Sequence, residues 1–289
     1  MSTTLGVLMK VGLSLGMLHP ALWIEATQLA DSLGYESVWL PEHLVMPVVA
    51  SGSPNAGEDH PPVPPDIQVF DVFAYMAFLA ARTSTIRLGT NVYNIGLRHP
   101  FSTARAISTI DQLSGGRIEF GIGASWMEQE WNAVQLDFST RGRRIDETLD
   151  ICQRLWNDDV IEHHGEFFDF DPVMFEPKPV QRPRPPIHIG GDAKPALRRC
   201  ALRADGWMPL NTPMEAIAAG RAEIESMMID AGRAGRVEVS YDVDVLGVDS
   251  LDRFADAGID RITIHPWARM REALDGIKRF ADEHDLGGA

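Results

Sequence analysis

Short apolar runs alternate with amphipathic segments along this chain, and that alternation limits the folds open to it. Such a pattern is typical of repeated βα units around a parallel sheet. The predicted strands are Val11–Leu15, Ser37–Leu40, Ile86–Val92, Ile118–Ile122, Ile187–Ile189, Gly206–Met208, Val237–Val245 and Arg261–His265. The predicted helices lie near Ala21–Leu33, Val69–Arg82, Phe101–Leu113, Arg141–Trp156, Pro195–Arg203, Met214–Ala231, Leu251–Ala257 and Arg269–Glu283.

Eight strands, each followed by a helix, are the number that a (β/α)8 TIM barrel requires, and such a barrel occupies about 250 residues. A doubly wound α/β sheet reaches a similar number of strands and is the alternative. We therefore predict one α/β domain over residues 1–289, with the barrel as the preferred architecture. Apolar residues at helical spacing, Ile145, Leu149, Cys152 and Trp156, predict the face of one helix that packs on the core.

Two stretches exceed what a minimal barrel needs. Leu44–Asp66 holds six prolines and no regular periodicity, so we predict a long loop after the second strand. Asp158–Arg184 is predicted to be an insertion before the fifth strand. Because long loops in compact domains are usually functional, we expect both to border the C-terminal face of the barrel, where barrel enzymes build their active sites.

Composition excludes several partners. The formal net charge of −15, from 26 Lys and Arg against 41 Asp and Glu, argues against binding to nucleic acid or to an anionic membrane. The two cysteines do not make a disulfide framework, and no apolar run approaches ~18 residues, so we expect a cytoplasmic protein. The adjacent pair His163 and His164 is poor geometry for one metal ion, and we expect no metal site.

The end of the fourth predicted strand carries almost no side-chain bulk. Asp111–Trp126 reads D-Q-L-S-G-G-R-I-E-F-G-I-G-A-S-W, with Gly121, Gly123 and Ala124 at the strand end. Close approach of the backbone to a large planar ligand is one reason to remove side chains from such a position.

A second glycine pair follows the fifth predicted strand in the sequence P-P-I-H-I-G-G, ending at Gly190 and Gly191. A helix with Pro195 in its first turn comes next, and the free amides of a helix start can bind phosphate. One interpretation of the acidic Asp192 is a cap of this helix, with Lys194 balancing its charge, and a turn that binds no ligand is the alternative to a phosphate site.

Both stretches, together with F-E-P-K-P-V-Q at Phe175–Gln181 and A-L-R-R-C-A-L-R-A-D-G-W ending at Trp207, resemble the luciferase-like monooxygenase superfamily. The resemblance is strongest to its actinobacterial branch of oxidoreductases that use the deazaflavin coenzyme F420. It implies a (β/α)8 barrel that binds F420, or alternatively FMN, across its C-terminal mouth. It also implies a small organic substrate and a homodimer.

His43 is the candidate proton relay. It ends the second predicted strand in the sequence W-L-P-E-H-L, directly after Glu42. Hydride transfer to or from carbon needs a proton moved in concert, and histidine suits neutral pH. The resemblance implies an acid–His pair at this strand end, with Glu42 orienting His43. The alternative is a His43 bonded to a neighbouring loop and a solvated Glu42.

The remaining cofactor contacts are implied by the resemblance. At Asn91 and Val92 the family has a bulge with a non-prolyl cis peptide behind the cofactor ring; the residues alone would equally suit a trans, hydrogen-bonded Asn91. Ser125, Trp126 and Gln129 match residues that line the ring. Some members have a proton-donating acid at the position of Trp126, a role that tryptophan cannot take.

Two further residues and one helix start stay open at this point. Glu128 and Glu130 are close to Trp126 in sequence, but their direction is not predicted. Arg98-His99-Pro100 is interpreted as a structural helix start, as is common in the family. By the resemblance, Gly190 and Gly191 form the turn that holds the cofactor phosphate.

The predicted function is therefore hydride transfer between F420 and a small organic substrate. An FMN-dependent monooxygenase that uses reduced flavin and oxygen is the alternative enzyme. A cofactor-binding protein without turnover is a third hypothesis, because Trp126 replaces the acid found in some members.

Overall fold

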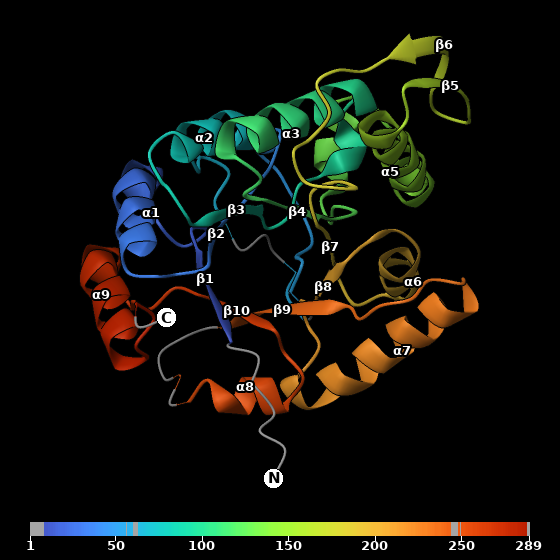
Figure 1. Cartoon of the computed structure of the whole chain (residues 1–289). Coiled ribbons are helices and arrows are strands. Elements are labelled where there is room, and N and C mark those ends of the chain that lie inside the picture. Colours follow the sequence, from blue (N-terminus) through green and yellow to red (C-terminus); the bar gives the residue numbers. More distant parts are fainter. Residues whose placement is uncertain (1–8, 56, 60–62, 244–247, 249, 288–289) are drawn as a thin grey trace.

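A computed structural model describes residues 9–55, 57–59, 63–243, 248 and 250–287. Eight parallel strands close into a barrel in the order β1, β10, β9, β8, β7, β4, β3, β2, and helices surround it (Figure 1). The barrel strands are β1 (Lys10–Ser14), β2 (Ser37–Leu40), β3 (Arg87–Thr90), β4 (Ile118–Ile122), β7 (Ile187–Gly190), β8 (Gly206–Met208), β9 (Glu238–Val243) and β10 (Arg261–Ile264). The predicted (β/α)8 fold is confirmed, and the last two residues of the predicted strand Val237–Val245 lie outside the described residues.

Eight of the nine described helices follow the predicted order, whereas the short helix α4 was not predicted. They are α1 (Trp23–Ser32), α2 (Val72–Ala80), α3 (Pro100–Ser114), α4 (Glu128–Ala133), α5 (Arg141–Asn157), α6 (Lys194–Arg203), α7 (Ile217–Asp230), α8 (Asp252–Asp256) and α9 (Ala273–Glu283). Single 3₁₀ turns lie at Pro20–Leu22, Ile95–Leu97, Phe138–Thr140, Met214–Ala216 and Met270–Glu272. The predicted core face of α5 is fully buried, and His99 caps α3 by accepting from the Phe101 amide, which confirms the helix start.

The insertion before β7 is a two-stranded hairpin, which the sequence did not predict. Its strands are β5 (Val160–His164) and β6 (Asp169–Met174), and they project from the side of the barrel beside α5 (Figure 1). The carboxylate of Glu147 on α5 accepts from the Phe168 amide at 2.9 Å, and the Phe170 ring lies 4.8 Å from that of Phe101 on α3. The hairpin contacts the outer helices α3 and α5, and its Phe168 ring lies 5.3 Å from that of His99, the residue that precedes α3.

A buried network of charged residues fills the N-terminal end of the barrel. Arg261 is fully buried and donates to both oxygens of Glu36, at 2.8 and 2.9 Å, and to Glu238. Nε2 of His188 lies 2.5 Å from Oε2 of Glu119. A buried charge is costly unless it is paired, and here each carboxylate has a cationic partner.

This network has the spacing of a metal site but the charge of an ion-pair cluster. The ligand atoms of Glu119, His188 and Glu238 lie within 4.8 Å of one another. Arg261 contacts Glu238 and lies 3.9 Å from Glu119, so its guanidinium already supplies the positive charge that these carboxylates require. The indole of Trp39 packs edge-on against His188, and Gly89 leaves room for it, because a Cβ there would lie 2.4 Å from the indole.

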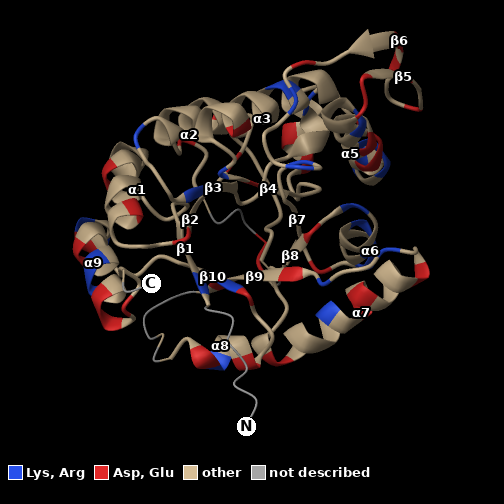
Figure 2. Cartoon of the chain, viewed as in Figure 1, with Lys and Arg blue, Asp and Glu red and all other residues tan. Residues whose placement is uncertain are grey.

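Charged residues are otherwise spread over the outer helices, with Asp and Glu prominent on α1, α7, α8 and α9, while the barrel strands are mostly uncharged (Figure 2). Within the described ranges, none of the helices combines the length and the apolar character that crossing a bilayer requires.

The Glu119 carboxyl makes a testable contribution to acid stability. Burial alone would raise its pKa, but the hydrogen bond with His188 and the charges of His188, Arg261 and Arg87 outweigh burial and lower the pKa to about 2. A lowered folded-state pKa stabilises the fold above the ordinary value of 4.5, and this stabilisation is lost as the pH falls toward 2. We expect the free energy of unfolding to fall less steeply for Glu119→Gln than for the parent between about pH 6 and about pH 3.

Urea unfolding at each pH measures this difference. Glu128→Gln removes an exposed carboxylate and serves as the control. We expect its free energy of unfolding to change with pH as steeply as that of the parent. Equal slopes for Glu119→Gln and the parent would contradict the prediction.

Candidate active site

The C-terminal ends of the barrel strands form one mouth, and four of the segments that leave them carry the predicted site. They follow β2 at residues 41–43, β3 at 91–98, β4 at 123–130 and β7 at 190–193. Because parallel strands share one direction, closure of the barrel brings these segments to the same face.

His43 is held at the mouth by a buried carboxylate. Its Nδ1 lies 3.3 Å from Oε2 of Glu130 on α4, and the side chain of Glu130 has no exposed surface, whereas that of His43 is 18% exposed. The Trp126 ring packs edge-on against the imidazole, with centroids 6.0 Å apart. The structure therefore brings together the predicted residues His43 and Trp126, and adds Glu130.

Glu42 faces a different partner. Its carboxylate accepts from the Asn94 amide at 2.9 Å and forms an ion pair with Arg98, and the residue is buried. Burial raises the pKa of the Glu42 carboxyl, against the opposing pull of the Arg98 charge. The hypothesis that Glu42 orients His43 is corrected, because Glu130 takes that place. Glu42 instead anchors the chain that follows β3.

The peptide bond between Asn91 and Val92 is cis. Asn91 donates its amide to the Leu40 carbonyl of β2 at 2.8 Å. The Val92 side chain lies between the ends of β4 and β7, since a Cβ on Gly123 would be 2.5 Å from its Cγ2 and a Cβ on Gly190 would be 3.0 Å from its Cγ1. Of the two possibilities that the sequence left open here, the structure has the cis bond.

The glycines of the mouth serve the packing of the protein itself. A Cβ on Gly121 would lie 1.9 Å from the Thr90 carbonyl oxygen, so this glycine permits close approach of β3. Gly123 and Gly190 accommodate Val92. The interpretation of the strand end as space left for a ligand is therefore corrected at these positions. Val92 itself is half-buried.

The turn after β4 places the other predicted contacts. Ser125 has a left-handed backbone, with φ of 62°, and its Oγ accepts from the Met127 amide at 3.3 Å. Nε2 of Gln129 donates to Oγ of Ser51 at 2.8 Å. Oε1 of Gln129 is buried and has no hydrogen-bond partner among the described residues.

The turn after β7 is more occupied than its glycines suggested. Gly191, with φ of 109°, donates its amide to the Met208 carbonyl at 3.0 Å and accepts from the Trp207 indole at 2.9 Å. Asp192 accepts from the Asn211 amide at 2.8 Å and from the Thr212 hydroxyl at 2.6 Å. The prediction that Asp192 caps α6 is wrong, because Ala193 occupies the cap position without a side-chain bond.

The loop after β2 reaches across the mouth to two other segments. Its first two residues, Leu44 and Val45, donate their amides to the carboxylate of Glu130. The Ser51 hydroxyl accepts from the side-chain amide of Gln129. Farther along, the Pro54 carbonyl accepts from the Asn211 side chain at 3.0 Å. The predicted loop Leu44–Asp66 therefore borders the mouth, although its residues 56 and 60–62 lie outside the described residues.

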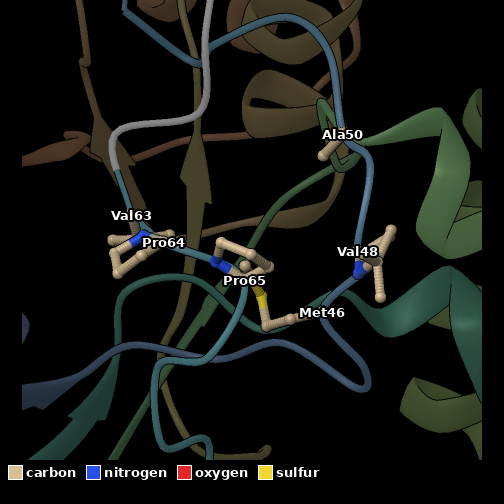
Figure 3. Close-up of a pocket in the computed structure, with 7 residues that line it drawn as sticks. Met46, Val48, Ala50, Val63, Pro64 and Pro65 are labelled. Atoms are coloured by element: carbon tan, nitrogen blue, oxygen red, sulfur yellow. The ribbon is translucent and has the colours of Figure 1, made fainter.

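An open pocket of about 330 Å³ lies between the two arms of this loop (Figure 3). It is lined by Met46, Pro47, Val48, Ala50, Val63, Pro64 and Pro65. Its lining side chains are uncharged, and the pocket is open to solvent, since Val48 is 87% exposed.

These features of fold and sequence are those of a family of redox enzymes. The sequence profile of the luciferase-like monooxygenase family matches residues 11–252, and the chain belongs to this family. An uncharacterized protein of Mycobacterium tuberculosis is 30% identical over 82% of this chain and 84% of its own.

Two solved structures share the fold over nearly the whole chain. Monooxygenase RslO1 from Streptomyces bottropensis has a TM-score of 0.77 at 21% identity, covering 97% of this chain and 100% of its own. An F420-dependent secondary alcohol dehydrogenase in complex with an F420-acetone adduct has a TM-score of 0.76 at 16% identity. The match covers 96% of this chain and 98% of the dehydrogenase chain. At these identities, the likeness shows the fold alone.

The nesting of Val92 against Gly123 gives a stability prediction. We expect Gly123→Ala to lower the free energy of unfolding by roughly 1–3 kcal/mol, because the new methyl group overlaps Cγ2 of Val92. In the double variant with Val92→Ala that overlap is gone, and the two substitutions together should cost less than the sum of their separate costs.

Thermal and urea unfolding of the three variants measures the coupling. Gly16→Ala is the matched control, since the nearest atoms to its Cβ are 3.8 and 4.0 Å away, and we expect a change within about 0.5 kcal/mol. Strict additivity of the Val92 and Gly123 substitutions would contradict the described packing.

Proposed function

We propose that this chain is a coenzyme F420-dependent oxidoreductase that transfers hydride to or from a small organic substrate. The observation that carries the proposal is an imidazole, His43, held at the barrel mouth by a buried carboxylate and flanked by Trp126. Hydride transfer at an alcohol, ketone or imine carbon requires a proton to move at the neighbouring heteroatom, and histidine suits that step.

The residues at the mouth are suited to contact the planar ring of the cofactor. Asn91 and Val92 would support the back of the ring, and Ser125, Trp126 and Gln129 would line it. The buried, unpartnered Oε1 of Gln129 supports this fit, because it is an acceptor that the chain itself does not satisfy. When bound, the deazaflavin supplies the carbon that gives or takes the hydride.

At the turn after β7, few groups of the chain are free to bind the cofactor phosphate. The Gly191 amide is already bonded to Met208, Pro195 has no amide hydrogen, and the Ala196 amide bonds to Ala193. The phosphate would therefore lie beside Gly190 and pair with the exposed Lys194 at the start of α6. Gly190 and Gly191 contribute a turn without side chains rather than a set of free amides.

The chain's own residues then have separate tasks. His43 holds or accepts the proton at the substrate heteroatom. Glu42 and Arg98 fix the segment after β3 and, through it, the position of Val92. The loop after β2 borders the mouth, and the uncharged side chains of its pocket would contact the hydrocarbon part of a substrate.

A second enzyme function has support of its own. RslO1, which matches this chain over its full length, is named a monooxygenase, so an FMN-dependent monooxygenase is the second candidate. The similar chain that is described as an F420-dependent secondary alcohol dehydrogenase supports the first candidate, since hydride exchange with an alcohol needs the proton relay that His43 offers. A protein that binds the cofactor without turnover is the third.

Cofactor titration separates the two enzymes. We expect oxidised F420 to quench tryptophan fluorescence of the purified protein with a Kd at least tenfold below that of FMN, a difference of about 1.4 kcal/mol. Trp126 at the mouth is the reporter, and Trp126→Phe should lose most of the quenching. Tight binding of FMN with no binding of F420 would reverse the order of the two candidates.

Substitution of His43 tests turnover. With F420 and a panel of small alcohols, ketones and imines, we expect His43→Asn to lower kcat by about 10²–10⁴-fold, because it removes general acid–base catalysis. The Kd for F420 should change little. His164→Asn, on the exposed hairpin, is the control and should retain the parent's kcat. Full activity of His43→Asn would remove this residue from the reaction, and no turnover by the parent would favour the binding protein.

A further inference from the structure

Glu130 is a buried carboxylate at the mouth that the sequence left without a role. It lies on α4, its side chain has no exposed surface, and it meets three donors. Oε1 accepts from the Leu44 amide at 2.6 Å and from the Val45 amide at 3.4 Å, while Oε2 lies 3.3 Å from Nδ1 of His43.

The donors and acceptors around this carboxylate allow only one position for the hydrogen of the neutral His43 imidazole. A backbone amide can only donate, so Leu44 and Val45 hold Oε1 as an acceptor. A carboxylate oxygen also only accepts, so Nδ1 of His43 must carry a hydrogen to bond to Oε2. The neutral imidazole then has its lone pair on Nε2, because the bond made by one ring nitrogen decides the state of the other.

The neighbouring groups reinforce this arrangement. Glu42 is the other buried carboxylate close by, but it is bonded to Arg98 and to the Asn94 amide and does not compete for the imidazole. The Trp126 ring stands perpendicular to that of His43, at an interplanar angle of 89°, and so limits rotation of the imidazole. The direction of Nε2 is therefore fixed from two sides.

We propose that Glu130 is a positioning residue that fixes His43 as the Nδ1–H tautomer, and that it joins this imidazole to the first residues of the loop after β2. Nε2 of His43 is then the atom that exchanges a proton with the substrate. The same carboxylate holds Leu44 and Val45, so the imidazole and the start of the loop keep one relative position. The catalytic part of this inference rests on the proposed function, whereas the tautomer does not.

Glu130→Gln gives a sharp test, because glutamine keeps the shape of the side chain. The amides of Leu44 and Val45 require the glutamine carbonyl oxygen to face them, so its NH₂ group faces Nδ1 of His43. An NH₂ group donates, so Nδ1 must accept and the hydrogen moves to Nε2. The substitution should therefore invert the tautomer while leaving the fold intact.

The measurement is a long-range ¹H–¹⁵N correlation spectrum of the full chain labelled at histidine nitrogens, recorded without cofactor at about pH 8.5, where a free imidazole is neutral. The chain has nine histidines, and loss of one signal set in His43→Asn assigns the residue. The parent should show a protonated Nδ1 and an unprotonated Nε2, and Glu130→Gln should exchange the two signals. Glu42→Gln is the matched control and should keep the parent pattern.

Each outcome decides the inference. A parent spectrum with the proton on Nε2 overturns it, and so does an unchanged tautomer in a folded Glu130→Gln variant. If that variant does not fold, the parent spectrum alone decides, because only the proposed arrangement places the hydrogen on Nδ1. Since the sample contains no cofactor, failure of the protein to bind F420 would refute the proposed function and leave this result standing.

Discussion

Closure of eight parallel strands into one ring is the constraint on which the rest of this structure depends. In the ring, β2 and β4 are separated only by β3, and all three end at the same face. This adjacency and the shared direction of the strands bring His43 and Glu130, 87 positions apart in sequence, within hydrogen-bonding distance, and closure adds the strands that complete the mouth around them. An open sheet would keep the neighbours of each strand but would not close the mouth around them.

The two ends of the barrel use buried charge differently. At the N-terminal end, Arg261 lies among the carboxylates of Glu36, Glu119 and Glu238, and paired charges fill the interior. At the mouth, Glu130 accepts from an imidazole and two amides and has no Lys or Arg in an ion pair with it among the described residues. Each end has an imidazole bonded to a carboxylate, but His188 is buried within the arginine-paired cluster, whereas the His43 side chain is 18% exposed and can exchange a proton at its other nitrogen. This contrast favours the mouth as the place of chemistry.

The glycine-rich strand ends show how one pattern can have two physical causes. A strand end without side chains suits a bound ring, but it equally suits close approach of another strand or of a side chain. Here Gly121 admits the Thr90 carbonyl, and Gly123 and Gly190 admit Val92. The glycines therefore shape the mouth indirectly, by allowing Val92 to form part of its surface.

The sequence by itself determined the fold class, the order of the barrel strands and of every described helix except α4, and the positions of His43, Trp126 and the two glycine turns at the strand ends. These follow from local periodicity and from the shared direction of parallel strands. The hairpin β5–β6 was not predicted, because its short strands pack on outer helices and carry no continuous apolar run.

Only the tertiary structure decided which groups meet. Glu42 precedes His43 in sequence, yet Glu42 pairs with Arg98 from the segment after β3, while His43 contacts Glu130 on α4. Asp192 likewise bonds to the turn after β8 rather than to the helix beside it. Hydrogen bonds between distant segments depend on how the ring closes, and local sequence does not contain that geometry.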